Sequence, residues 1–525
     1  MFMKRSLRGL AAFASLGMAV SCGYLSGGGS GDQGPIVVGT TSAPSTLDPA
    51  GSWDGSWELF RNVYQTLLAY PNGATTPEPD AAKSCAFSSD HRVYRCELKD
   101  GLKFSNGDKL DAEAVKHSVE RIRAINAQTG PAGLLGSLDK VETSGDREVV
   151  FRLNKPDATF PFVLATPALS LVPPVDYPDN SLRKDSRVIG SGPYRLDSYE
   201  QGKEAVLVRN PSYKGLANRK NDAVTIRYFQ DSATMVKSLR DGGIDITYQG
   251  LAADDVVSLE GKSDENKGLE LYEGAGSAIN YLVFNPKDKA ANNIAVRQAI
   301  AQTIDRPAIA HKVYQDTVEP LYSMVPQGLT GHTTPYFDVF GDPDPAKAKK
   351  ILDEAGVTTP VPLTLWYTSD RYGSDTGLEF KEIKAQLDGS GLFRVTLNSR
   401  PWNTYVVGYE KGEYPVFGRG WQPDFPDPDN FIAPFVGQQN ALGTPYAVKK
   451  ITDVLLPRSR EQSNRADVVK DFQEAQRILV EDVRLLPLWQ GKQYIAANED
   501  VGGAERALDP ATIMMVWELS RKTSW

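Results

Sequence analysis

Cysteine and histidine are scarce in this sequence, with 3 cysteines and 4 histidines among 525 residues. So few cysteines exclude the dense disulfide framework of a small secreted scaffold. The histidines are His91, His117, His311 and His332, and none is paired at metal-ligand spacing, which excludes a zinc hydrolase of the H-E-x-x-H type. The G-x-S-x-G nucleophile elbow of serine hydrolases is missing as well.

Two further motifs are incomplete. Residues 261–263 resemble the end of a P-loop, but Val256 stands where the first glycine of the phosphate cradle is needed. Asp424, Asp427 and Asp429 lie close together, yet a calcium-binding EF-hand loop also needs a glycine at its sixth position and a distal glutamate. The sequence therefore predicts a surface turn at 261–263, a loop carboxylate cluster at 424–429, and no metal site or cofactor.

An excess of positive charge is also absent. Lysine and arginine number 58 against 66 acidic residues, so the net charge is −8 and the isoelectric point is near 5.3. This balance argues against nucleic-acid binding. Apolar residues make up 41% and charged residues 24% of the chain, which is ordinary globular composition. At roughly 150 residues per domain, the length predicts about two to four domains.

The N-terminus has the pattern of an export signal. Basic residues within the first eight positions precede a short apolar run at 9–20, which is too short to span a membrane. The run ends in A-V-S-C-G at 19–23, which resembles a bacterial lipobox with Ala19 where leucine is preferred. The resemblance implies cleavage before Cys22 and lipidation of its thiol and amino group. The alternative is an unmodified cysteine beside an ordinary cleavage site.

Residues 1–21 are therefore predicted to be a lipoprotein signal peptide, and residues 22–34, rich in glycine and serine, a flexible tether. Loss of the signal peptide removes three positive charges and no negative charge, so the net charge changes from −8 to −11. We expect an exported chain held by acyl groups to the outer face of the cytoplasmic membrane.

The two remaining cysteines, Cys85 and Cys96, are expected to form a disulfide, because exported proteins with two cysteines usually pair them. Residues 88–91 between them have turn composition and are flanked by short strand-like runs, so the bridge would staple a hairpin. Closing so short a loop should stabilise the fold by roughly 2–3 kcal/mol.

Both secondary-structure periods recur along the chain, which predicts α/β architecture. Helices are predicted to begin at Asp111, at Asp344, and at Ser463, where the longest helix would start. Strands are predicted at 35–40, 149–153, 205–209, 224–229, 281–285, 363–367 and 394–397.

Several segments, in order, resemble one family. They are V-Y-R-C-E-L-K-D-G-L-K-F-S-N-G at 93–107, G-S-G-P-Y at 190–194, V-R-N-P-S-Y at 208–213, D-G-G-I-D-I at 241–246, F-N at 284–285, V-R-Q-A-I at 296–300, I-D-R at 304–306 and G-W-Q-P-D-F-P-D-P at 420–428. Together they resemble the family 5 solute-binding proteins of bacterial ABC importers, the oligopeptide- and dipeptide-binding group. The resemblance runs from about residue 36 to the C-terminus, although Cys85 stands near where the family usually has a tryptophan.

The resemblance implies a periplasmic-binding-protein-like fold of the Venus-flytrap type, with two lobes that close on ligand and an extra domain inserted in the first lobe. Lobe I would comprise 35–80, 185–275 and 491–525. The inserted domain would span 81–184, and lobe II would span 276–490.

The resemblance also implies a ligand site. The aspartate three residues after the Gly-Trp pair binds the ligand's α-ammonium in peptide-binding members, and here it is Asp424. Peptide main chain would pair with the backbone at Gly420 and Trp421. The alternative for Asp424 is a capped turn residue in a proline-rich loop.

Three other side chains are candidates near this segment. Trp402 and Trp489 resemble aromatic pocket walls, and plain core packing is the alternative for both. Arg419 adjoins the same loop, but the arginine of some oligopeptide binders stands one position earlier, where this chain has Gly418. No residue could be assigned to the ligand carboxylate.

The resulting hypothesis is a monomeric, non-enzymatic lipoprotein that captures oligopeptides or dipeptides and delivers them to the transmembrane subunits and ATPase of an ABC permease. One alternative is a receptor of the same fold for a nickel complex, haem or an oligosaccharide. A more remote alternative is a secreted hydrolase, against which the missing nucleophile and metal motifs argue.

Overall fold

The computed structural model describes residues 34–52, 56–437 and 440–522. The predicted signal peptide, Cys22 and nearly all of the predicted tether lie outside the described residues. Within the described part of the chain, no helix is long and apolar enough to cross a membrane.

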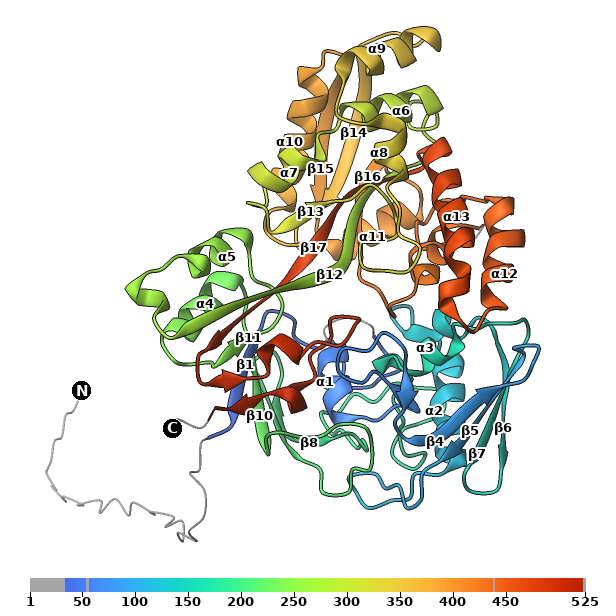
Figure 1. Ribbon diagram of the computed structural model, residues 1–525, viewed down its shortest axis with the longest axis vertical. Helices are drawn as coiled ribbons and strands as arrows, with labels where there is room; N and C mark the ends of the chain where they lie inside the picture. The colour runs from blue at the N-terminus through green and yellow to red at the C-terminus, as the bar shows by residue number, and fades with distance from the viewer. Residues whose placement is uncertain (1–33, 53–55, 438–439, 523–525) are drawn as a thin grey trace, which may run out of the picture. The chain divides into compact units, whose positions relative to one another are not determined.

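One 11-stranded sheet passes through most of the chain from Pro35 onward (Figure 1). Its strands, in spatial order, are β15 (Phe393–Arg400), β14 (Val361–Thr368), β16 (Val416–Trp421), β12 (Leu269–Phe284), β17 (Leu485–Asn498), β11 (Ile246–Thr247), β1 (Ile36–Thr40), β10 (Ala223–Tyr228), β9 (Glu204–Arg209) and β8 (Tyr194–Glu200), with β13 (Val318–Pro320) paired to β17. The seven predicted strands are all present. The strand predicted at 281–285 is the end of the much longer β12.

The two long strands β12 and β17 are antiparallel partners and connect the two halves of this sheet. Their pairing shifts register between Ala275 and Ile279. At this shift the backbones approach closely, since a Cβ on Gly276 would lie 2.2 Å from the carbonyl oxygen of Gly491. A side chain at position 276 would therefore push the strands apart.

Separate hydrophobic cores lie on the two sides of these long strands. The first core contains β1, β10 and α1 (Ser56–Val63), and it also contains the inner faces of a second sheet in the order β4 (Ala82–Phe87), β5 (Val93–Leu98), β7 (Glu148–Leu153), β6 (Leu138–Ser144). Two further cores flank β14, β15 and β16. We call these two parts the first and second lobes. The predicted insertion 81–184 shares the first lobe's core, and the predicted boundaries stay predictions.

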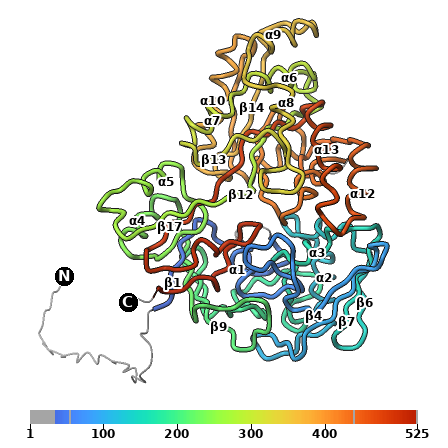
Figure 2. Tube along the Cα trace, viewed as in Figure 1, coloured from blue at the N-terminus to red at the C-terminus, as the bar shows by residue number. Residues whose placement is uncertain are grey.

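The C-terminal segment returns to the first lobe, where it lies beside α1 (Figure 2). The side-chain amide of Asn62 donates to the carbonyl of Met514 at 2.9 Å and accepts from the backbone N–H of Val516 at 3.1 Å. These bonds join residues more than 450 positions apart in the chain.

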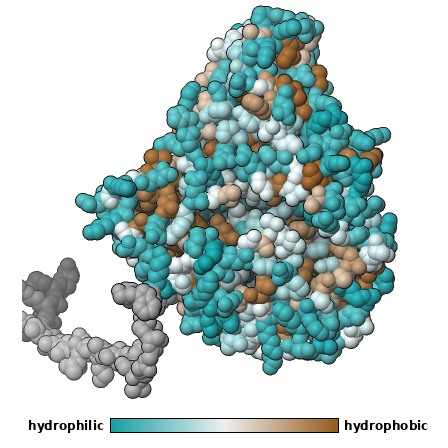
Figure 3. All heavy atoms as spheres, viewed as in Figure 1, coloured by the Kyte–Doolittle hydropathy of each residue, from teal (hydrophilic) through white to brown (hydrophobic). Residues whose placement is uncertain are grey.

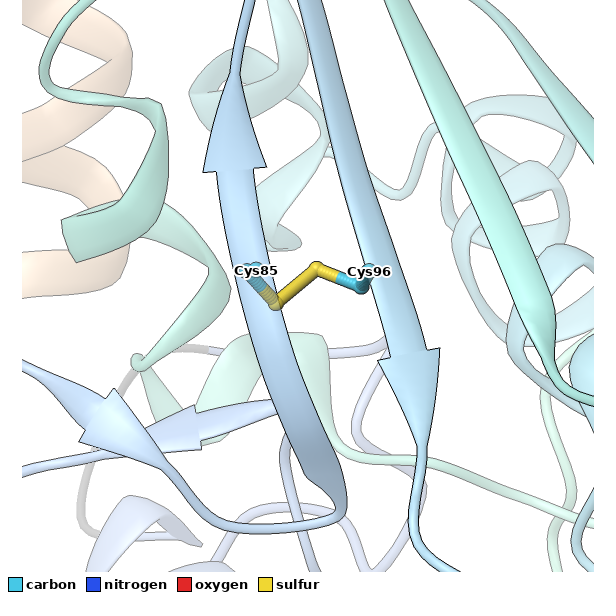
Figure 4. The surroundings of a disulfide bond; sticks show 2 residues. All are labelled: Cys85 and Cys96. Carbon is cyan, nitrogen blue, oxygen red and sulfur yellow. A yellow bond between two sulfur atoms is a disulfide. The ribbon is translucent and has the colours of Figure 1, made fainter.

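The predicted disulfide is present in the second sheet (Figure 4). Cys85 on β4 and Cys96 on β5 are directly opposite each other, and their Sγ atoms are 2.03 Å apart. The helix α2 (Ala112–Ile125) packs against β6 and β7, and the Asp111 carboxylate caps it by accepting from the N–H of Ala114 at 3.1 Å. Both the hairpin and this helix start were predicted.

The predicted start of the longest helix was wrong. Asn464 caps a short 3-10 turn by accepting from the N–H of Ala466, and the α-helix α13 (Val469–Asp482) begins only after that turn. Asparagine competes with serine as an N-cap, and the hydroxyl of Ser463 instead contacts His91. The helix has 14 residues, as do α2 and α10 (Thr376–Gly389).

The remaining elements surround the sheets. The helices are α3 (Phe160–Leu164), α4 (Ser232–Arg240), α5 (Ala253–Glu260), α6 (Ile294–Thr303), α7 (Arg306–Lys312), α8 (Pro335–Phe340), α9 (Pro345–Glu354), α11 (Trp402–Glu410) and α12 (Leu456–Arg460), of which α9 has the predicted Asp344 cap. Two short ladders pair β2 (Leu68–Ala69) with β3 (Glu78–Pro79) and β18 (Val501–Gly502) with β19 (Ser520–Arg521). Figure 3 shows one face, on which hydrophilic residues predominate.

A buried ion pair fastens α2 to the loop after β1. The Arg121 guanidinium donates to both carboxylate oxygens of Asp48 at 2.7 and 2.9 Å, and the two residues are 2% and 1% exposed. We expect Asp48→Ala to lower the free energy of unfolding by about 3–5 kcal/mol, because it leaves a buried guanidinium unpaired. Asp241→Ala, which removes an exposed pair with Lys237, should cost less than about 0.5 kcal/mol. Urea denaturation of both variants measures the difference, and equal losses would contradict the assignment.

Candidate functional site

The end of β16 has a free edge. β12 pairs with β16 along its whole length, whereas β14 pairs only with Val416 and Phe417. Among the described residues, no strand pairs with Gly418–Trp421 on the β14 side. The hydroxyl of Tyr405 lies 2.9 Å from the carbonyl oxygen of Gly418 and 3.1 Å from that of Trp366, so it bridges β16 and β14 where their pairing ends. The backbone from Arg419 to Trp421 can therefore accept another extended chain.

Gly420 is required by a close neighbour. A Cβ at this position would lie 2.8 Å from a ring carbon of Tyr372 and 3.1 Å from the side-chain oxygen of Asn280. The Tyr372 ring therefore covers the strand at the predicted binding position. Any side chain at residue 420 would displace this ring.

Arg419 and Trp421 alternate with Gly420 and contact different neighbours. The Arg419 guanidinium lies 4.3 Å from the centroid of the Tyr409 ring and donates from Nη1 to the carbonyl of Ala441 at 2.6 Å. The Trp421 ring packs edge-on against Phe435, with centroids 5.1 Å apart. Arg419 is buried and makes no ion pair with any described carboxylate. Its guanidinium bonds the 441 loop and the side chain of Tyr372, and a contact with ligand stays a prediction.

Asp424 is a buried carboxylate without a counter-ion among the described residues. It is 9% exposed, and its Oδ2 accepts from the side-chain amide of Asn430 at 2.8 Å. The same Asn430 accepts from the backbone N–H of Asp424 at 2.9 Å and from the Trp421 indole at 3.2 Å. The side-chain amide of Asn430 therefore fixes both Trp421 and Asp424. Oδ1 of Asp424 receives no hydrogen bond from the described part of the chain.

The two neighbouring aspartates differ from Asp424, because each has its own arginine. Asp427 accepts two hydrogen bonds from Arg465 at 2.7 and 2.9 Å. Asp429 accepts two from Arg460, both at 2.8 Å. The carboxylate cluster predicted from the sequence therefore contains two neutralised members and one that is not. Of these three aspartates, only Asp424 retains the capacity to bind a cation from outside the chain.

Burial raises the pKa of the Asp424 carboxyl to about 6, although the hydrogen bond from Asn430 opposes this shift. The direction follows from desolvation, which disfavours the charged form when no positive group is near. A buried acid with a strongly perturbed pKa and no cationic partner is typical of a functional site.

The loop that carries Asp424 also contacts the first lobe. The side-chain amide of Gln422 donates to the hydroxyl of Thr512 at 2.7 Å, and the ring of Phe425 lies 6.0 Å from that of Phe162. Thr512 has a φ of +67°, which a β-branched residue rarely adopts. The Asp424 site therefore lies where segments of both lobes meet.

The two other predicted tryptophans have different surroundings. Trp402, at the start of α11, is half-buried, and its ring lies 5.9 Å from that of Tyr372, which in turn contacts Gly420. Trp489 is buried in a core of the second lobe and donates to the Glu379 carboxylate at 3.0 Å. Trp402 is thus linked to the Gly420 edge, and both ligand roles stay predictions.

Sequence reasoning missed two residues here. The Arg371 guanidinium lies 5.3 Å from the centroid of the Trp402 ring, and no described carboxylate forms an ion pair with it. Asn430 was missed as the residue that holds Asp424. An exposed arginine and a loop asparagine have no distinguishing local pattern, so only their spatial neighbours identify them. The described residues also contain no group of three or more histidine, cysteine or acidic side chains placed to hold a metal ion.

Comparison with known proteins identifies similar chains across nearly the whole length. The profile described as "Bacterial extracellular solute-binding proteins, family 5 Middle" matches residues 76–443. The Probable D,D-dipeptide-binding periplasmic protein DdpA of Escherichia coli K12 is 28% identical over 488 residues, which cover 89% of this chain and 90% of that protein.

Solved structures show the same two-lobed fold. The periplasmic binding protein DppA of Helicobacter pylori, in complex with the peptide STSA, has a TM-score of 0.79 at 24% identity and covers 93% of this chain and 98% of its own. The binding protein AgaA of A. tumefaciens R10, in complex with agropinic acid, has a TM-score of 0.78 at 22% identity over 94% of this chain and 99% of its own.

The missing counter-ion of Asp424 has a consequence for stability. Because the pKa of this carboxyl is about 6 in the folded protein and near 3.8 when exposed, the folded protein binds a proton more tightly than the unfolded chain. The free energy of unfolding should therefore fall as pH rises from 4 to 6. We expect Asp424→Asn to reduce this fall by the contribution of Asp424 and to stabilise the unliganded protein by about 1–3 kcal/mol at pH 8.

The matched control is Asp427→Asn, three residues along the same loop. It should destabilise the protein by about 3 kcal/mol, because it leaves Arg465 without its partner. Denaturant titrations of both variants at pH 5 and pH 8 measure the two effects. A loss of stability in Asp424→Asn as large as that in Asp427→Asn would show that Asp424 is a structural residue.

Proposed function

Because this chain belongs to family 5 of the bacterial extracellular solute-binding proteins, which are binding proteins and not enzymes, we propose that it captures short peptides outside the cell for an ABC importer. In this proposal a lipid on Cys22 anchors the protein to the outer face of the cytoplasmic membrane. The monomer delivers its peptide to the transmembrane subunits of a permease driven by an ATPase. The similarity to a D,D-dipeptide-binding protein and to a structure with bound peptide supports the ligand class.

The observation that carries the proposal is the buried Asp424 carboxylate beside the free edge of β16. A peptide has an α-ammonium, which supplies the missing positive charge, and an extended backbone, which can pair with the chain at Gly420 and Trp421. A charge-assisted bond is strongest where water is excluded, and Asp424 lies where the two lobes meet. Recognition through main chain and terminus leaves peptide side chains free to vary.

The opposite terminus of the peptide needs a cation. Arg371 meets this need, because its guanidinium lies over Trp402 next to the ring of Tyr372 and has no ion-pair partner among the described residues. Trp402 would then hold the arginine by a cation–π contact and form one wall of the site.

Closure of the lobes would complete the site. Ligand contacts that exist only in the closed state shift the population toward that state, as in hinge-type binding proteins. The contacts of Gln422 with Thr512 and of Phe425 with Phe162 already join the loop of Asp424 to the first lobe in this structure, so a ligand bound at Asp424 would lie beside both lobes.

A receptor for a non-peptide solute is the second candidate. The structural similarity to a binding protein in complex with agropinic acid favours it, because the same fold holds a different ligand there. A nickel complex, haem and an oligosaccharide are further possibilities within this class. The uncompensated Asp424 favours a ligand that carries an amino group.

The first prediction concerns the ligand that the protein carries. Residues 23–525, expressed in soluble form and purified without denaturation, should release peptides of uniform length and varied sequence on unfolding, because the site recognises termini and main chain. Mass spectrometry of the released material measures this. Recovery of a sugar, a metal complex or a single metabolite would overturn the peptide assignment and keep the binding-protein family.

The second prediction concerns Asp424. We expect Asp424→Asn to weaken binding of a peptide with a free amino terminus by about 2–5 kcal/mol, because a charge pair is lost in a desolvated site. The N-acetylated form of the same peptide, which has no ammonium, should bind weakly and equally to both proteins. Isothermal titration calorimetry gives the four affinities. Unchanged affinity for the free peptide would exclude Asp424 from the site.

A further inference from the structure

A small pocket lies on the face of β16 opposite to Arg419. It lies between the sheet and the first turn of α10, and its polar lining comprises Asn280, Thr368, Tyr372, Thr376 and Glu379. The strand contributes Gly418, where a Cβ would lie 2.5 Å from the ring of Phe380. A side chain at residue 418 would therefore obstruct the pocket.

This pocket adjoins the proposed peptide edge. Tyr372 lines it and also covers Gly420, so one ring separates the pocket from the strand that would hold the ligand. The pocket also lies at the carboxyl end of β14, where Tyr367 and Thr368 line it, and ligands bind at the carboxyl ends of strands in open α/β sheets. In this structure the space inside the pocket is about 10 Å³, that of a single water molecule. The side chain of a peptide bound at Gly420 would enter it only if the Tyr372 ring turned away from the strand.

Glu379 supplies a negative group to the pocket. It is 3% exposed, and its two oxygens accept from the Tyr314 hydroxyl at 2.8 Å and from the Trp489 indole at 3.0 Å. No described cation forms an ion pair with it, since Lys312, on the neighbouring α7, pairs with Glu382. Burial raises the pKa of the Glu379 carboxyl to about 7. Each oxygen retains a lone pair for a further donor.

We propose that this pocket is a side-chain subsite and that Glu379 selects a ligand residue whose side chain ends in an amino group. The inference rests on the proposed function. The amino group would supply the counter-ion that Glu379 lacks, as the α-ammonium does for Asp424, and the rings of Tyr367 and Phe380 would contact the methylene groups. Tyr314 and Trp489 fix the carboxylate, so Trp489 acts behind the pocket and not as its wall.

The test uses tripeptides of alanine in which one position carries lysine, Nε-acetyl-lysine, norleucine or glutamate. At one of the three peptide positions, lysine should give an affinity at least about tenfold higher than norleucine or acetyl-lysine. The reason is that only lysine carries a positive charge that neutralises Glu379. The glutamate peptide should bind most weakly. This series needs no variant, and equal affinities for lysine and norleucine at all three positions would overturn the inference.

Glu379→Gln should abolish the preference for lysine and change the affinity for the norleucine peptide less than about threefold, since the amide keeps the size of the side chain. The control is Glu382→Gln, one turn along α10, which should keep the preference. A structural role for Glu379 would instead lower all affinities together. Binding of the norleucine peptide without a lysine preference would leave the proposed function intact, whereas no binding of any peptide by the wild-type protein would overturn both proposals.

Discussion

The arrangement of the site depends on one uncompensated charge, the buried carboxylate of Asp424. Its loop contains two other buried aspartates, and Arg460 and Arg465 neutralise those two. Asn430 holds Asp424 in place without supplying a positive charge. A buried charge without a partner destabilises a folded protein unless something compensates it, so its persistence here is best explained by a partner that arrives from solution. In the proposed function, the α-ammonium of a ligand would provide the charge, and closure of the lobes would exclude water and so strengthen the interaction.

The rest of the second lobe holds the Asp424 carboxylate near a strand edge whose backbone is free to form hydrogen bonds. β12 supports one side of β16, and β14 ends its pairing at Phe417, so the last residues of β16 are open on the other side. Gly418 and Gly420 have no side chains on one face of the strand, and the rings of Phe380 and Tyr372, respectively, fill the space that a Cβ would occupy there. Asp424 follows four residues after Gly420, so the proposed anchor for a peptide terminus and the proposed edge for its main chain come from one short segment.

Asp424 and Glu379 have the same kind of surroundings, but only Asp424 could be recognised from the sequence. Each is almost completely buried, each accepts uncharged hydrogen bonds, and each lacks a cation among the described residues. Asp424 was identified from its place in the Gly-Trp motif. Glu379 lies in an ordinary amphipathic helix, where glutamate normally faces water, and nothing in the spacing of its neighbours indicated that Tyr314 and Trp489 would enclose it.

The sequence by itself determined the α/β class, the seven strands, the disulfide hairpin, the cap at Asp111, and the family to which the segment at 420–428 belongs. These features depend on residues close together in the chain, whose periodicity and turn composition have local physical causes. The start of α13 was misplaced because Asn464, and not Ser463, caps the chain here, and because a 3-10 turn precedes the α-helix, while the Ser463 hydroxyl contacts His91. Tertiary structure alone decided which aspartate lacks a counter-ion, which tryptophan lies near the strand edge, and where Arg371 and Glu379 lie. These are pairings between side chains tens of residues apart, and no local pattern encodes the distance between them.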